Sequence, residues 1–461
     1  MNLEIMYSTF KDCRINQIVA FYSSFNLNFE ELKKLNSGQL KALFRRTEYF
    51  YNSIPIFGSF NKNIYDLDFV ENNKCRALHL KSYIDPTELI MYICHRRDFI
   101  NFLCENSELS DKIENFKKIL FFCERKITID LDLDKQGIYI VHFDFKLKKE
   151  IQTNDLTDLV DLTCQLSDEI LFKIIENDLN KNFFKNVDNK LLLNDKNKEN
   201  FSLVHETYTV TVSTNFDTYC DNDYMKEIVG IGWKQPDFAD LNGITLQKIM
   251  KNNISFYKND ILLITSVGTI MAIKGTSLKG DYINGRMNAI AMFCRQNLLL
   301  KKIHMSIDDL INNSLIDSNN PEDSINEIQK IQINIQSDLV FYENVILSIV
   351  DSYKLLFETF NNVLETDNKY KLIKSKIESS KSIYGNVIDN RRHKQMRDLQ
   401  IIVLLVGILT IVITSAFSNW VDIYKNWDYF IDFLNVNSQI IIIILFIIIS
   451  LIVVYFKSKK K

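Results

Sequence analysis

Two long uncharged apolar runs near the C-terminal end constrain this chain more than any other feature. Residues 401–417 read IIVLLVGILTIVITSAF and residues 440–456 read IIIIILFIIISLIVVYF, so each run has 17 residues without a charge. A helix that crosses a bilayer core of roughly 30 Å needs about 20 predominantly apolar residues. Flanking polar and aromatic residues extend the first run by about a turn. The pattern predicts two membrane spans, at residues 399–420 and 439–456.

Charges beside the two runs predict their orientation. Basic residues precede the first run and form the tail at residues 457–461, whereas the connecting segment, residues 421–438, holds one Lys and three Asp. Positive charge stays on the cytoplasmic side of a membrane. We therefore expect both termini in the cytoplasm and the connecting segment outside. The N-terminal residues show no charged-then-apolar signal pattern, so the expected location is the inner (plasma) membrane, with more than one span.

Composition excludes several classes of protein. The formal net charge is −3 and no half of the chain is strongly basic, which argues against direct binding to nucleic acid. The eight cysteines form no C-x-x-C pair, so we expect them to be reduced and buried rather than zinc ligands. No set of metal-ligating residues stands out, and the sequence assigns neither a resident metal nor a cofactor.

The remaining residues predict a domain followed by long helices. Residues 1–281 are expected to form a mixed α/β domain. Its predicted elements are a hairpin at residues 126–133 and 138–147, a strand at 205–213, a strand pair at 261–265 and 269–274, and a helix at 156–179. Residues 282–398 are expected to form a helical hairpin and stalk. Its parts are a helix at 287–315, a break at 317–323, a heptad run at 325–363, a tight turn at 365–369 and a last helix that runs from about Tyr370 into the first span. The expected fold class is therefore an α+β cytoplasmic domain with a long helical hairpin or stalk and two C-terminal transmembrane helices.

The first span has one small and polar face. At helical steps of three or four, the stripe contains Gln400, Val403, Gly407, Thr410, Thr414 and Ser418. A polar face is costly against lipid, so it must meet protein or water. Two interpretations stay open: a contact between helices, where small and hydroxyl residues are common, and a pore whose inner ring is built from the first spans of several copies. Because one stripe on two spans cannot enclose a pore, the pore interpretation requires a homo-oligomer.

The architecture resembles the CorA family of divalent-cation channels. Members of that family have a cytoplasmic α/β domain, a long stalk helix continuous with the first of two C-terminal spans, and both termini inside. The first span of the family ends in Gly-Met-Asn. In this chain Asn419 matches the last position, while Phe417-Ser418 replaces Gly-Met, and residues 390–393 (NRRH) then stand opposite the Asn-Arg-Met-Asn-like stalk motif.

The resemblance implies several properties. It implies a pentamer, a pore mouth that contains Asn419, and Mg²⁺ or another divalent cation as the permeant or regulatory ion. The missing Gly-Met pair makes the chain similar to a divergent branch, the CorA-like effectors of type III CRISPR systems. That branch implies a channel in antiviral defence that responds to a messenger made of S-adenosylmethionine joined to AMP. A divergent Mg²⁺ transporter and a non-conducting receptor or scaffold are the alternatives.

Three basic segments are candidates for binding a small nucleotide-like ligand. The first, residues 274–286 (KGTSLKGDYINGR), is rich in glycine and is expected to lead from a strand into a helix, where a phosphate can bind. The other two place arginines beside aromatic residues, which can pair a phosphate and stack a base. The candidate residues are Lys274, Thr276, Ser277, Lys279 and Arg286 in the first segment, Arg45 and Arg46 in the second, and Arg96 and Arg97 in the third. A plain strand-to-helix loop and ordinary basic surface are the competing interpretations.

Enzymatic signatures are absent from the sequence. His205-Glu206 is followed by Thr209 where a zincin needs its second histidine. Residues 230–235 lack the rest of the dinucleotide fingerprint, and no G-x-S-x-G nucleophile elbow occurs. We therefore expect no enzyme, and a membrane-anchored hydrolase or nuclease is the least favoured alternative.

Overall fold

The computed structural model describes a large part of the chain. The described residues are 8–22, 27–35, 39, 66–72, 75–85, 109–134, 137–177, 190, 205–217, 224–235, 242–255, 260–273, 279–316, 333, 335–337, 339–340 and 351–418. The chain divides into two compact units. The first contains Met1–His304 and Gln336–Lys371, and the second contains Met305–Ile335 and Leu372–Lys461.

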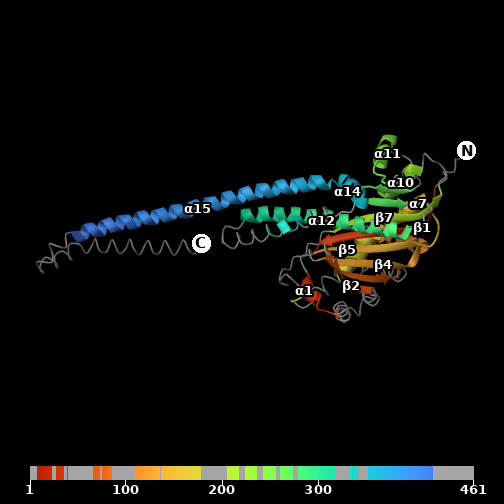
Figure 1. Cartoon of the computed structure of the whole chain (residues 1–461), viewed down its shortest axis with the longest axis horizontal. Helices are drawn as coiled ribbons and strands as arrows, with labels where there is room; N and C mark the ends of the chain where they lie inside the picture. The colour runs from red at the N-terminus through yellow and green to blue at the C-terminus, as the bar shows by residue number, and fades with distance from the viewer. Residues whose placement is uncertain are drawn as a thin grey trace. The chain divides into compact units, whose positions relative to one another are not determined.

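The first unit is built around one sheet. Its described strands are β1 (Thr9–Tyr22), β2 (Asp66–Asn72), β3 (Cys75–Ile84), β4 (Cys123–Asp134), β5 (Ile138–Leu147), β6 (Ile151–Gln152), β7 (His205–Asp217), β8 (Ile261–Ile264) and β9 (Gly268–Ala272). Their order is β2-β3-β4-β5-β1-β7-β9-β8, with β6 paired to the start of β1 (Figure 1). All these neighbours are antiparallel except β7 and β9, which are parallel. The N-terminal strand thus lies in the interior of the sheet.

The predicted strands are confirmed. β4 and β5 form the expected hairpin, in which Leu133 pairs with Tyr139. Gly137 in the turn has φ of 71°, a conformation that costs glycine little. β7 begins at the predicted residue, His205, and β8 and β9 form the predicted antiparallel pair.

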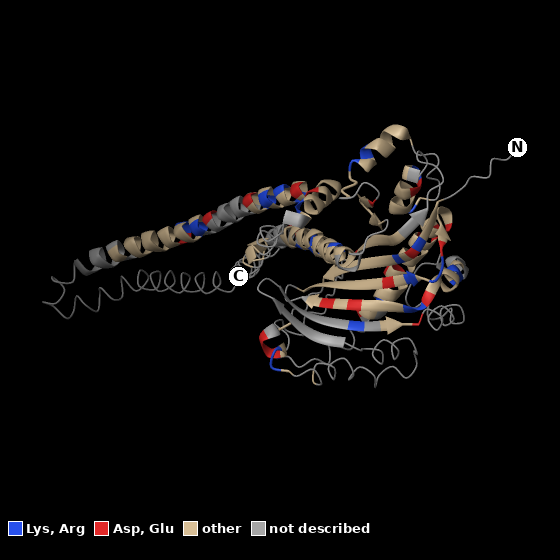
Figure 2. Ribbon diagram, turned by 45° about the vertical axis from the view of Figure 1, so that its right-hand side comes forward, with Lys and Arg blue, Asp and Glu red and all other residues tan. Residues whose placement is uncertain are grey.

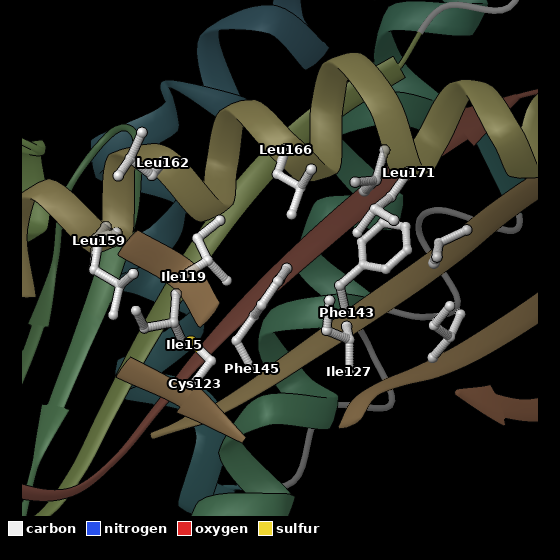
Figure 3. Packing of buried hydrophobic residues seen from close by; sticks show 14 of the residues in the cluster. Ile15, Ile119, Cys123, Ile127, Phe143, Phe145, Leu159, Leu162, Leu166 and Leu171 are labelled. Carbon is white, nitrogen blue, oxygen red and sulfur yellow. The ribbon is translucent and has the colours of Figure 1, made fainter. Parts of the chain in front are cut away.

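The sheet has two faces, and helices cover the one that bears the large buried core, here called the first face. α6 (Leu109–Phe122), α7 (Thr153–Gln165), the π-helical turn η2 (Leu166–Leu171) and α8 (Phe172–Asn177) are the main ones, and the last three form the helix predicted at 156–179. Leu159, Leu162 and Leu166 meet Phe143 and Phe145 of β5 in a large buried core (Figure 3). Odd-numbered residues of β5, and of β1 from Cys13 onward, face this core because side chains alternate along a strand. Shorter helices are α1 (Phe29–Leu32), α10 (Tyr224–Trp233) and α11 (Gly243–Met250).

The second face of the sheet packs against long helices. These are the part of α12 (Lys279–Ile316) up to His304, α14 (Asp351–Leu364) and the first residues of α15 (Thr366–Ser418). The ring of Tyr208 on β7 lies 5.1 Å from that of Phe360 on α14, and Phe293 on α12 lies 5.4 Å from Phe360. An aromatic cluster therefore holds α12 and α14 to this side of β7.

The long helices differ from the expectation at their ends. α12 begins at Lys279, earlier than the predicted start at Met287. Residues 279–286, which were not predicted to be part of this helix, are therefore helical. α14 and α15 are separated only by Glu365, whose φ of 53° reverses the helical path, and this confirms the predicted turn in a shorter form. α15 then continues without a break for 53 residues, as predicted. The predicted break at 317–323 and most of the heptad run at 325–363 lie outside the described residues.

Candidate functional site

The candidate pore stripe lies on the C-terminal part of α15. Gln400, Val403, Gly407 and Thr410 are all exposed, and Val403 keeps 61% of its surface. No atom lies within 4 Å of the position that a Cβ on Gly407 would take, and the Thr410 hydroxyl donates a hydrogen bond to the carbonyl of Val406 at 2.8 Å. The stripe thus offers two small positions and one amide on one side of the helix. The side chains of Thr414 and Ser418, and all of Asn419, lie outside the described residues.

Apolar side chains surround this stripe. Those with large exposed fractions are Leu399, Ile401, Ile402, Leu404, Val406 and Ile408, at 43–63%. Charged residues occur along the first part of α15 and stop before Leu399 (Figure 2). Within the part of the chain that the structure describes, no helix has both the length and the apolar character needed to cross a bilayer. The side chains of residues 411–418, and the second apolar run at 440–456, lie outside that part.

The glycine-rich candidate segment leads from β9 into α12, as expected. Lys274, Thr276 and Ser277 lie outside the described residues, and Lys279 is the first residue of α12. Arg286 lies two turns further along α12, only 4% exposed, with its guanidinium carbon 4.0 Å from the centre of the Tyr282 ring. Arg286 is therefore buried within α12 rather than exposed near its beginning. The candidates Arg45, Arg46, Arg96 and Arg97 lie outside the described residues.

The beginning of β7 forms a polar cluster that the sequence did not predict. Nε2 of His205 lies 2.9 Å from Oδ1 of Asp168, and the Thr207 hydroxyl donates to the same oxygen at 2.5 Å. Burial alone would raise the pKa of Asp168, but these hydrogen bonds and the nearby charge of Lys234 outweigh it and hold that pKa below its usual value. The cluster fastens β7 to the π-helical turn η2.

Glu206, between His205 and Thr207 on β7, points to the opposite face of the sheet. Glu206 accepts a hydrogen bond from Nδ2 of Asn297 at 2.6 Å and one from Nζ of Lys301 at 3.1 Å, both on α12. Oδ1 of Asn297 accepts from Nζ of Lys369, on the first turn of α15, at 2.9 Å. The amide of Asn297 thus bridges a carboxylate on the sheet and an ammonium group on α15.

A second polar row lies on the same face, between β1 and β5. Arg14 forms an ion pair with Asp144, and Nε2 of His142 lies 3.0 Å from Oδ1 of Asn16. Burial lowers the pKa of His142, and the nearby carboxylates of Asp144 and Asp130 oppose that shift only in part. His142 is therefore held neutral in the folded protein.

These polar clusters contain no metal centre. In the described residues, no group of three or more His, Cys, Asp or Glu side chains is arranged to hold a metal ion. Comparison of the chain with protein-family models, with curated proteins and with solved structures gave no match.

Distance along the chain explains why the sequence did not predict the two polar clusters on β7. Asp168 and His205 are separated by 37 residues, and Glu206 and Asn297 by 91. Only the pairing of strands and the packing of helices bring them together. The one local signal is the alternation of polar residues at 205–207, which places successive side chains on opposite faces.

Proposed function

We propose that this chain is a homo-oligomeric membrane ion channel of CorA-like architecture, opened by a ligand that binds its sheet domain. The observation that carries the proposal is the change of character along α15. One uninterrupted helix begins beside the sheet at Thr366, is charged up to Asp398, and then becomes apolar on nearly every side. A helix of this kind joins a water-facing domain to a membrane.

Exposure of the apolar part supports a membrane location. Seven large apolar side chains within ten residues keep 43–63% of their surface. Exposed apolar patches of this kind are rare on soluble monomers and mark surfaces that another phase or molecule covers. Lipid covers the Ile, Leu and Val faces in this proposal, and the second run at 440–456 provides the outer helix.

The polar stripe supports an oligomer with a water-filled centre. Gln400, Gly407 and Thr410 share one side of α15 and are exposed, and no atom lies within 4 Å of the position that a Cβ on Gly407 would take. Facing lipid would be costly for Gln400 in particular. Stripes from several copies, five by family resemblance, would meet around a central pore.

The bond network at the start of α15 supports control by the sheet domain. Asn297 links Lys369 on α15 to Glu206 on β7, and His205 and Thr207, on either side of Glu206, bind Asp168. A ligand that shifts β7 would therefore act on the first turn of the pore helix. The ligand class that we propose is a phosphate-bearing small molecule, such as the S-adenosylmethionine–AMP conjugate, with Mg²⁺ as the alternative.

Cysteine substitution with flux measurement tests the proposal. The full-length chain in liposomes would carry Gly407→Cys or Thr410→Cys, with Ile402→Cys and Leu405→Cys as matched controls on the apolar faces. We expect a water-soluble thiol reagent to change ion flux through the first two variants only. Equal modification of all four, or no flux from the parent protein with either the conjugate or Mg²⁺, would show that α15 does not line a pore.

A further inference from the structure

A thiol and an ammonium group contact each other in the helix layer, outside both candidate sites. Nζ of Lys234 lies 2.7 Å from Sγ of Cys164, which is in the last turn of α7. Both residues are half-buried, so small solutes can reach them. Reactive cysteines in proteins are typically partly exposed and have a basic side chain beside the sulfur.

The backbone at Lys234 is held in a conformation that lysine rarely adopts. Lys234 follows the last residue of α10 and has φ of 59°. Its N–H donates to the carbonyl of Ile231 at 3.2 Å, and that of Gln235 donates to Gly230 at 2.9 Å. This pair of bonds is the Schellman ending of a helix, whose left-handed position usually holds glycine. The chain thus places a lysine at a strained position from which its side chain reaches Cys164.

The other three cysteines whose side chains the structure describes are in a different environment. Cys13, Cys123 and Cys294 are buried. Burial raises the pKa of Cys13 and of Cys123 to about 12, and it also raises that of Cys294. Such thiols remain protonated and shielded from solutes. Of the four cysteines whose side chains the structure describes, Cys164 is the one that combines partial exposure with a cation in contact.

A buried hydroxyl beside Cys164 gives an independent indication. Ser167 lies three residues further along the same helical segment and is fully buried. Its Oγ makes no hydrogen bond within the described part of the chain. Residues three apart on a helix are neighbours, so this hydroxyl is a candidate donor to an oxygen atom added to the sulfur. The carboxylate of Asp168, one residue further, is already bound by His205 and Thr207.

We propose that Cys164 is a modification site for hydrogen peroxide, activated by Lys234. The thiolate sulfur attacks one peroxide oxygen, the O–O bond breaks, and the leaving hydroxide takes the proton that the thiol released, forming water. Cys164 is oxidised by two electrons to the sulfenic acid, and peroxide is reduced. The new S–OH group accepts a hydrogen bond from Ser167. Because Lys234 directly follows α10 and Cys164 lies in the last turn of α7, the modification acts on the link between these two helices.

Peptide mass spectrometry of the full-length protein tests this proposal. The protein would be exposed to hydrogen peroxide with a sulfenic-acid trap, and the rate of labelling would be compared between Cys164 and the two buried thiols Cys13 and Cys123. We expect Cys164 to be labelled at least about tenfold faster than either. Equal rates at the three cysteines would overturn the proposal.

Two substitutions at Lys234 separate activation from exposure. Lys234→Gly removes the ammonium and also relieves the left-handed strain, so the variant should fold at least as well as the parent. We expect it to lower the rate at Cys164 about tenfold, and Lys234→Arg, which keeps the charge, to preserve most of the rate. An unchanged or faster rate in Lys234→Gly would show that exposure alone makes Cys164 reactive, and would refute the role of Lys234.

Discussion

Replacing Asn297 by leucine tests the connection between the sheet and α15. Leucine has nearly the shape of asparagine but cannot bridge Glu206 and Lys369. Asn297 is 8% exposed, and both of its hydrogen bonds go to charged groups, at 2.6 and 2.9 Å. Each such bond contributes about 1.5–3 kcal/mol when buried.

The expected loss is smaller than the sum of two buried bonds. The side chain of Glu206 is 32% exposed and keeps its bond to Lys301, and Lys369 is exposed, so water replaces part of what the amide provided. We therefore expect Asn297→Leu to lower the free energy of local opening by about 2 kcal/mol. Amide hydrogen exchange in α12 around Asn297 and in the first turns of α15 should then become about 30-fold faster.

The neighbouring amide provides a matched control. Gln296 is also buried, at 3% exposure, but its Nε2 donates to no acceptor within the described residues. Removing a buried donor that has no acceptor is neutral or stabilising when an apolar group of similar shape replaces it, so Gln296→Met should leave exchange unchanged or slower. If the two variants change exchange equally, or Asn297→Leu changes nothing, the bridge does not hold α15 to the sheet.

Two further predictions concern the stability of the sheet domain. Gly268→Ala should cost about 1–3 kcal/mol in chemical denaturation, because its Cβ would lie 3.0 Å from the carbonyl oxygen of Thr209; Gly243→Ala, with nothing within 4 Å of its Cβ, should cost nothing, and equal losses would contradict the reasoning. Burial lowers the pKa of His142 from its usual 6.5, so the unfolded chain binds a proton that the folded chain refuses, and stability should fall as the pH drops below about 6.5. His142→Gln should flatten that part of the pH profile, and a parent protein whose stability is level between about pH 5 and 7 would refute this.

The parts of the fold that the sequence predicted correctly are those with a clear local sequence pattern. The β4–β5 hairpin alternates strictly and turns at a glycine, so its strands were recognisable without knowledge of their partners. β1 was not, because residues 18–21 are all buried at 0–1% exposure and the alternation disappears. A strand covered on both faces loses the period that identifies it.

Where the predictions from sequence failed, tertiary contacts determined the structure. The predicted start of α12 was late because glycine disfavours helix and the segment contains several. At Gly285 the space that a side chain would occupy is taken by the hydroxyl of Tyr353 on α14, so glycine is accommodated by packing. The pore stripe needed only helical spacing, whereas the contact between Cys164 and Lys234 needed the fold.

The length of α15 has a mechanical consequence. Its 53 residues span about 80 Å at 1.5 Å per residue, with no proline to interrupt them. If such a rod turns about its first residues by roughly 3°, a point about 60 Å along it moves sideways by about 3 Å. Gly407 lies at about that distance from Thr366. A shift of a fraction of an ångström at Lys369 therefore becomes, at Gly407, a displacement about as wide as a water molecule.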